Sequence, residues 1–296
     1  MSATLEQLTR QHQTLRSIRS IVRTMKTMAA VNAAPYEEAA EAIQAWQQTL
    51  DHGFAAFAHR MGGPLPSAAP AWRRQLLVAF GSDHGFCGNY NELMAEVVLQ
   101  FCRRQPRPPE LICIGARLER ALVERELEVE HRLMPPASVD GLGRLAGELV
   151  GLVESLHRGQ SLAELAVELA YTRRASHGSR EAVTTPLLPL PPALLQPLRR
   201  WPSPSLPDFS MHPEALLAAL LRHYLYARVF HGATEAMVTE NAARLALMQQ
   251  AEQAVDDQLE SVGRQMAGVR QDVITHELMD IVTGHGGLAE EEGDGR

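Results

Sequence analysis

The stretch LRSIRSIVRTMKTMAAVNAAPYEEAAEAIQAWQQTL, residues 15–50, decides how the chain folds. From it a series of mostly apolar positions, spaced alternately three and four apart, runs on to Phe57. The members are Leu15, Ile18, Val22, Met25, Ala29, Asn32, Tyr36, Ala39, Ile43, Trp46, Leu50, Gly53 and Phe57. About six heptads of this spacing are typical of a coiled-coil seam. Residues 3–60 are therefore predicted to form one long helix, which MGGP at 61–64 ends. Pro35 predicts a bend or a local break near 31–35.

The last part of the chain, about 213–284, has the same spacing. Its seam is Val238, Asn241, Leu245, Met248, Glu252, Val255, Leu259, Val262, Met266, Val269, Val273 and His276. At 1.5 Å per residue the two helices would be about 85 Å and 105 Å long, more than a compact domain spans. They are predicted to run antiparallel as a rod, with the end of the longer C-terminal helix unpaired. A compact helical bundle is the alternative.

The middle of the chain changes period. Short apolar runs at 75–80 and 111–115 suit buried strands, and 89–104, 117–128 and 139–157 suit helices. Further strands are expected near 129–133, at 164–174 and at 181–190. Strands that alternate with helices predict an α/β fold with a mostly parallel, Rossmann-like sheet. The predicted segments are an N-terminal helix (1–62), a central α/β domain (72–207, with a Pro-rich loop at 186–207), a C-terminal helix (208–286) and a disordered tail (287–296).

Net charge, cysteine pattern and apolar content argue against several classes of protein. A net charge of −7 argues against nucleic-acid binding, which needs a basic surface. The three cysteines form no CxxC motif and no even framework, so a reducing compartment is expected. The N-terminus is polar, and no stretch of about 18 apolar residues predicts a membrane span.

One face of the first predicted helix is basic. Arg16, Arg19, Arg23 and Lys26 fall within an arc of about 80° on the helical wheel. No Asp or Glu lies between Gln7 and Tyr36, whereas a solvated helix usually mixes both signs of charge. The stripe therefore predicts contact with an acidic partner. A solvated basic face is the alternative.

The stretch GSDHGFCGNYN, residues 81–91, looks like a binding loop because it follows an apolar run and contains three glycines. It lacks the GK[ST] of a P-loop and the GxGxxG of a dinucleotide site. Asp83, His84 and Cys87 could ligate a metal ion, but no second cluster completes a set of four ligands. No further sequence feature supports a Cys–His nucleophile pair.

The favoured interpretation of this stretch is a turn from a strand into a helix. The turn residues are Gly81, Asp83, Gly85 and Gly88. Asn89 or Asn91 is expected to cap the helix that follows. The sequence thus predicts no catalytic residue, no metal site and no cofactor.

Three blocks together resemble the gamma subunit of F-type ATP synthases. They are IVRTMKTMAA (21–30), GSDHGFCGNYN (81–91), and TENAARLALMQQA (239–251) with RQDVITHELMDIVTGHGGL (270–288). Their order and spacing cover nearly the whole chain. The resemblance implies a non-catalytic rotor shaft, in which the two terminal helices form an antiparallel coiled coil inside a hexamer of alpha and beta subunits. The α/β domain would lie against the epsilon subunit and the membrane c-ring, and nucleotide would bind to other subunits.

The resemblance also assigns contacts by matched position. Met25, with Arg23 and Lys26, would meet acidic loops of beta. The other polar shaft contacts would be Glu240, Arg244, Arg270, Gln271, Thr275 and Glu277. The complex would lie at the cytoplasmic face of the bacterial inner membrane.

The chain departs from the family pattern at VNAAPYEEA (31–39), at His84 and at His285, which indicates a divergent branch such as the alternate Na⁺-type ATPases. The shaft does not touch the transported ion in this family, so H⁺ and Na⁺ both stay open. Two other functions stay open on the residues alone: a coiled-coil scaffold or adaptor protein, and a small α/β nucleotide-binding enzyme with helical arms.

Overall fold

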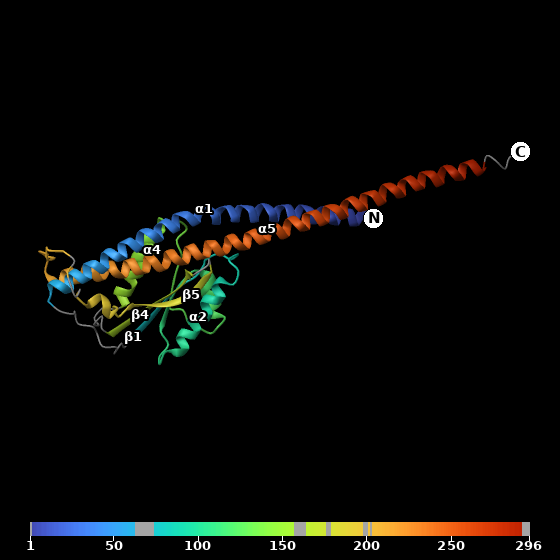
Figure 1. Ribbon diagram of the computed structural model, residues 1–296. Coiled ribbons are helices and arrows are strands. Elements are labelled where there is room, and N and C mark those ends of the chain that lie inside the picture. The colour runs from blue at the N-terminus through green and yellow to red at the C-terminus, as the bar shows by residue number, and fades with distance from the viewer. Residues whose placement is uncertain are drawn as a thin grey trace. The chain divides into compact units, whose positions relative to one another are not determined.

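The computed structural model describes residues 2–62, 74–156, 164–175, 179–197, 201 and 203–291 (Figure 1). The chain divides into two compact units. Unit 1 comprises Met1–Met28 and Ala246–Arg296, and unit 2 comprises Ala29–Leu245. The two terminal helices, α1 (Ser2–Arg60) and α5 (Pro213–Glu291), each contribute to both units. In the described residues, no helix is long and apolar enough to cross a membrane.

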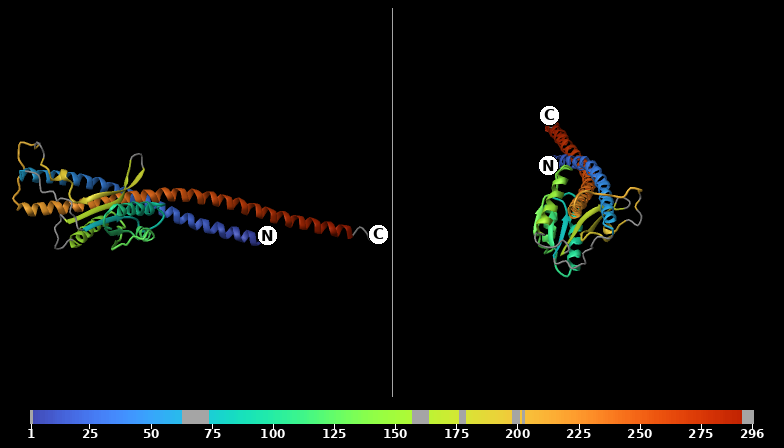
Figure 2. Two further views of the ribbon diagram at one scale, coloured as in Figure 1. Left: turned by 90° about the horizontal axis from the view of Figure 1, so that it is seen from below. Right: turned by 90° about the vertical axis from the view of Figure 1, so that its left-hand side faces the viewer.

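Unit 1 is a pair of antiparallel helices. Arg19 of α1 lies level with Asp256 of α5, and Arg23 lies level with Glu252, so the chain directions are opposite. The helices enclose a small apolar core formed by Leu8, Leu15, Val255, Leu259, Val262 and Met266. The same register places Ser2 level with Val273. The rest of α5 runs past the start of α1, as Figures 1 and 2 show, and this confirms the predicted unpaired end.

The seam of α1 is buried at every seventh residue. The buried members are Leu15, Val22, Ala29, Tyr36, Ile43, Leu50 and Phe57. The alternate positions are less covered, and at Ile18 and Trp46 the prediction of a buried seam is wrong, since these side chains are 40% and 43% exposed. The helix is unbroken through Pro35, so the local break did not occur. Proline lacks only its own N–H, and the rest of the hydrogen-bond ladder and the burial of Tyr36 hold the helix together.

The sheet belongs to unit 2 and has the strand order β3-β2-β1-β4-β5. Its strands are β1 (Arg74–Phe80), β2 (Glu110–Ile114), β3 (His131–Leu133), β4 (Leu165–Arg174) and β5 (Arg180–Leu188). All neighbouring strands are parallel except β4 and β5, which pair antiparallel. The prediction of a mostly parallel sheet with alternating helices is confirmed.

Alternate residues of the strands face two separate cores. Leu77 and Ala79 pack beneath α2 (Tyr90–Arg104) and α3 (Ala116–Val123). Leu76 and Val78 face α4 (Gly141–Leu156) and the portions of α1 and α5 that belong to unit 2. Both faces of the sheet are thus covered by helices, as a parallel sheet requires.

Several predicted boundaries move. The helix expected at 117–128 ends at Val123. The strand expected at 181–190 is confirmed as β5, and the Pro-rich loop expected from 186 therefore begins only after Leu188. A 3-10 turn follows at Pro192–Leu195. The helix α5 continues to Glu291, so 287–291 is helical where a disordered tail was expected. Gly63, Pro64, His157 and 292–296 lie outside the described residues.

Candidate functional site

The basic stripe on α1 pairs with acidic residues of the same chain. The Arg23 Nε lies 2.7 Å from one oxygen of Glu252, and the Lys26 Nζ lies 2.5 Å from the other. These hydrogen bonds lower the pKa of the Glu252 carboxyl. The Arg19 Nε lies 2.7 Å from Asp256, although the two groups are not aligned as a hydrogen bond. Three of the four cations of the stripe are thus paired within the chain, and contact of the stripe with an acidic partner protein stays a prediction. Arg16 has no ion-pair partner within the described residues.

The helices of unit 1 also carry apolar side chains that the structure leaves uncovered. On α1, Ile21 and Met28 are 59% and 60% exposed, and Met25 between them is half-buried. Near the end of α5, Ile274, Leu278 and Ile281 are similarly exposed. Exposed apolar residues that recur along both helices are typical of a surface that another protein covers.

The polar residues predicted near the end of α5 are on its surface. Arg270, Gln271, Thr275 and Glu277 are all exposed. The Thr275 hydroxyl donates to the backbone oxygen of Gln271 at 2.9 Å. Within the described residues, Arg270 and Glu277 form no ion pair. These side chains are therefore free to contact another subunit, and that role stays a prediction.

Glu240 and Arg244, in contrast, are inside unit 2. They form an ion pair of 2.5 Å, and their side chains are only 6% and 13% exposed. Burial raises the pKa of the Glu240 carboxyl, against the opposing effect of Arg244. The sequence resemblance places both residues among the contacts with other subunits. In this structure Glu240 is covered, so a partner could reach it only after a rearrangement.

The loop at 81–91 forms a rigid turn. The Asn91 side chain accepts a hydrogen bond from the Ser82 N–H at 2.9 Å and donates to the Ser82 hydroxyl at 2.8 Å. Asp83 accepts a hydrogen bond from the Ala116 N–H, at the start of α3. A side chain at Gly81 would collide with Leu118, which explains the glycine there.

The expected helix cap takes another form. Asn89 stands at the N-cap of α2 but makes no hydrogen bond from its side chain, whereas Asn91, already inside α2, binds back to the loop. Phe86 and Gly88 adopt left-handed backbone conformations with φ of 63° and 66°. Both allow the chain to turn sharply between β1 and α2.

The residues of this loop form neither a reactive Cys–His pair nor a metal site among the described residues. Cys87 is buried, and burial raises the pKa of its thiol, which disfavours the nucleophilic thiolate. His84 points a largely exposed ring near Asp83, at 3.9 Å. No group of three or more potential metal ligands occurs among the described residues.

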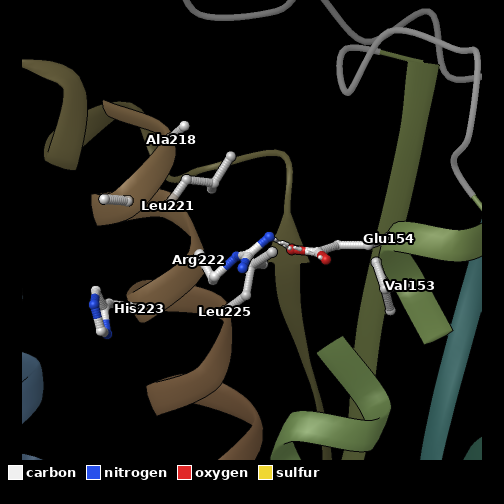
Figure 3. A pocket seen from close by; sticks show the side chains of 8 residues that line it. Val153, Glu154, Ala218, Leu221, Arg222, His223 and Leu225 are labelled. Atoms are coloured by element: carbon white, nitrogen blue, oxygen red, sulfur yellow. Dashed lines mark hydrogen bonds and ion pairs between the residues drawn. The ribbon is translucent and has the colours of Figure 1, made fainter. Parts of the chain in front are cut away.

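Unit 2 has two cavities whose lining residues bear on ligand binding. The larger, about 490 Å³, lies between α4 and α5 and is lined by apolar residues with an Arg222–Glu154 ion pair of 3.1 Å (Figure 3). His223 also contributes to the lining, and its ring meets that of Trp46 edge-on, with the ring centroids 6.0 Å apart. The smaller cavity, about 390 Å³, lies beside Phe86 and is lined by both arginines and glutamates. The described lining of the larger cavity has no Cys or Ser nucleophile, and in the smaller cavity burial raises the pKa of the Cys87 thiol, which disfavours its reactive thiolate.

A polar network between the sheet and α5 could not be anticipated from the sequence. The Arg174 guanidinium lies 2.8 Å from Glu235, and the Arg174 N–H donates to the same carboxylate at 3.1 Å. Burial alone would raise the pKa of the Glu235 carboxyl, but the hydrogen bonds from Arg174 lower it overall. The residues are 61 positions apart, and no motif links them.

Comparison with known proteins gives one family. A family model described as ATP synthase matches residues 4–288. The chain is 26% identical over 318 residues to the ATP synthase gamma chain of Parafrankia sp. (strain EAN1pec), covering 98% of this chain and 99% of that one. It is 27% identical over 288 residues to that of Anaeromyxobacter sp. (strain K), covering 91% and 94%.

Solved structures show the same fold. A chain from the rotor of Euglena gracilis mitochondrial ATP synthase is similar with a TM-score of 0.62 at 13% identity, covering 93% of this chain and 100% of that one. A chain from the central stalk and c-ring of Tetrahymena thermophila mitochondrial ATP synthase has a TM-score of 0.54 at 17% identity, covering 78% and 99%.

Proposed function

Because the chain belongs to the ATP synthase gamma chain family and is the non-catalytic central-stalk subunit of an F-type ATP synthase rotor, we propose how its parts engage the rest of the complex. The paired helices of unit 1 turn inside a ring of alpha and beta subunits. The α/β domain meets the epsilon subunit and the membrane c-ring. Rotation then couples ion movement through the c-ring to ATP synthesis or hydrolysis on beta, at the cytoplasmic face of the bacterial inner membrane.

The observation that carries this proposal is the uncovered apolar surface of unit 1. Ile21 and Met28 on α1, with Ile274, Leu278 and Ile281 on α5, would be solvated in an isolated chain. A surrounding ring of subunits would cover them. Because apolar contacts are not directional, such a surface can turn against its surroundings without breaking a fixed set of bonds.

The polar contacts proposed for torque transmission lie on the same helices. Arg270, Gln271, Thr275 and Glu277 are exposed on α5, where they can bind beta. On α1, Arg16 is exposed and unpaired within the described residues, and Met25 is half-buried. Arg23 and Lys26 are engaged with Glu252, so they contact beta only through their remaining N–H groups.

The test is the double substitution Arg270→Ala and Gln271→Ala in the assembled complex. We expect the complex to assemble and ATP-driven ion transport to fall, because directional contacts with beta are lost. A matched control is Gln100→Ala with Arg103→Ala, an exposed Gln–Arg pair on α2 of the α/β domain. The torque contact is wrong if transport and hydrolysis equal those of the control. Failure of the chain to copurify with beta-type subunits would overturn the placement in the ring.

A further inference from the structure

One segment of α5 packs against the sheet through small residues. A Cβ added at Gly232 would lie at ordinary contact distance from the sheet, 3.4 Å from the ring of Tyr171 and 3.7 Å from that of Phe80, so this turn of α5 packs directly against the sheet. Ala233 and Ala236 continue this face and are buried. Small residues let the helix rest near the carboxyl ends of β1 and β4.

Hydrogen bonds join this segment of α5 to the α/β domain at three places, one from α2 and two from β4. The Tyr90 hydroxyl donates to the Ala236 backbone oxygen at 2.9 Å. The Thr239 hydroxyl lies 3.1 Å from the Thr172 backbone oxygen and shares its single proton with carbonyls of its own helix. Arg174 binds Glu235 through both its guanidinium and its backbone N–H. We call Tyr90, Thr172, Arg174, Glu235 and Thr239 the polar clamp.

Most of the clamp is shielded from water. Tyr90, Thr172, Glu235 and Thr239 are all buried, whereas the Arg174 side chain, which reaches the buried Glu235, is 45% exposed. A buried hydrogen bond cannot be replaced by water when it breaks, so its loss costs more than that of an exposed bond. The matching pair Arg173–Glu181, one residue earlier on β4, joins β4 to β5 at 3.1 Å and is about half exposed on both sides.

Apolar packing and the clamp resist different movements. The surrounding contacts of α5 with Phe80, Leu169 and Tyr171 resist separation of the helix from the sheet, but they have no preferred direction. Hydrogen bonds weaken steeply once their geometry is lost. Rolling α5 about its axis, or sliding it by one residue, would break the Tyr90, Thr172 and Arg174 bonds together.

We infer that the polar clamp positions α5 on the α/β domain and transmits torque between them, so that its loss uncouples ion transport from ATP hydrolysis under load. This inference rests on the rotor function. The role of the clamp residues is to keep the shaft helix from slipping relative to the domain that meets the ring.

The experiment compares two triple variants in the whole complex reconstituted into vesicles. The clamp variant is Tyr90→Phe, Arg174→Met and Glu235→Met, which keeps the apolar contacts and leaves no buried charge unpaired. The control is Tyr226→Phe, Arg173→Met and Glu181→Met. Ions transported per ATP hydrolysed are measured without and with an opposing ion gradient.

We expect similar ratios for both variants at zero gradient, and at least a threefold lower ratio for the clamp variant against a steep gradient. A purely structural role would lower assembly or activity at every load alike. Equal ratios under load overturn the inference, whereas a control complex that never couples overturns the rotor function instead. If the triple variant does not assemble, Tyr90→Phe alone is measured. A smaller fall in the same direction supports the clamp, and an unchanged ratio counts against it.

Discussion

Substituting Gly81 by alanine tests whether the loop at 81–91 is a rigid turn. The new Cβ would lie 2.3 Å from the Leu118 Cβ, 2.8 Å from its Cδ2 and 2.9 Å from the Asn91 side-chain oxygen. The Leu118 Cβ is fixed to the backbone of α3, so no rotamer change can relieve this contact. Either α3 or the loop must move by about 1 Å to restore van der Waals distance.

That movement has a second cost. The backbone of α3 is hydrogen-bonded to the loop, from the Arg117 N–H to the Ser82 oxygen at 3.0 Å, and Asn91 binds the Ser82 N–H. Overpacking costs about 1 to 3 kcal/mol, and an unsatisfied buried polar group costs about 1 to 3 kcal/mol more. We therefore expect Gly81→Ala to lower the free energy of unfolding of unit 2 by roughly 2 to 6 kcal/mol.

The assay is urea unfolding of the full chain, followed by hydrogen exchange of the β1 and β2 amides so that unit 2 is read separately. Two other glycines serve as controls. Gly147→Ala, in α4 with no atom within 4 Å of the new Cβ, should stabilise by about 0.5 to 1 kcal/mol. Gly88→Ala meets no atom either but must hold φ at +66°, so it should cost about 1 to 2 kcal/mol. If Gly81→Ala is no less stable than Gly88→Ala, the loop yields easily and the rigid-turn interpretation is refuted.

Two further substitutions test the electrostatics. Burial raises the pKa of Glu168 to about 7, and its carboxylate has no hydrogen-bond or ion-pair partner in the described residues. Below pH 4.5 the Glu168 carboxyl is protonated in both the folded and the unfolded chain, so it does not affect stability. Between pH 4.5 and 7 the unfolded chain loses this proton first, and above pH 7 the folded chain must bury the charged carboxylate, which destabilises it. Glu168→Gln should therefore add about 1 to 2 kcal/mol of stability above pH 7, after discounting for solvent screening, and none below 4.5; a pH-independent gain in urea unfolding would contradict this. Glu252→Gln should lower the thermal midpoint of unit 1 at pH 7, because the lowered pKa of Glu252 stabilises the fold above about pH 4.5. In circular dichroism melts this loss should shrink at 1 M salt, and an equal loss at both salt concentrations would contradict an ionic origin.

The periodic part of the fold was predictable because periodicity depends only on local sequence. Both long helices, the alternating strands and the unpaired end of α5 were expected from spacing alone. Ile18 and Trp46 show the limit of that reasoning, since their spacing fits the seam but their side chains remain substantially exposed. An α-helix has 3.6 residues per turn, so two turns do not match a seven-residue repeat. The spacing therefore marks a wider face of the helix than the part that is buried.

The site was less predictable because its parts meet only in three dimensions. The basic stripe predicts contact with an acidic partner, but nothing in the stripe identifies Glu252 and Asp256, more than 220 positions away, as the residues with which three of its cations pair. Arg174 and Glu235 have the same limitation. Glu240 shows the reverse case, since the resemblance matches it to a contact with another subunit but its side chain is buried.

Unit 1 has its ion pairs between its own two helices and leaves apolar side chains exposed, and this arrangement suits a subunit that rotates. In unit 1, Arg19, Arg23 and Lys26 form ion pairs with α5, while Ile21 and Ile274 remain exposed. A rotating part needs directional bonds within itself, to stay rigid, and non-directional contacts outside, to avoid locking in one orientation. The exposed polar residues Arg270 and Gln271 are the exception, since directional contacts there would favour particular angles. A few such contacts would define resting positions, and for this reason the double substitution at these two residues distinguishes a torque contact from a passive bearing.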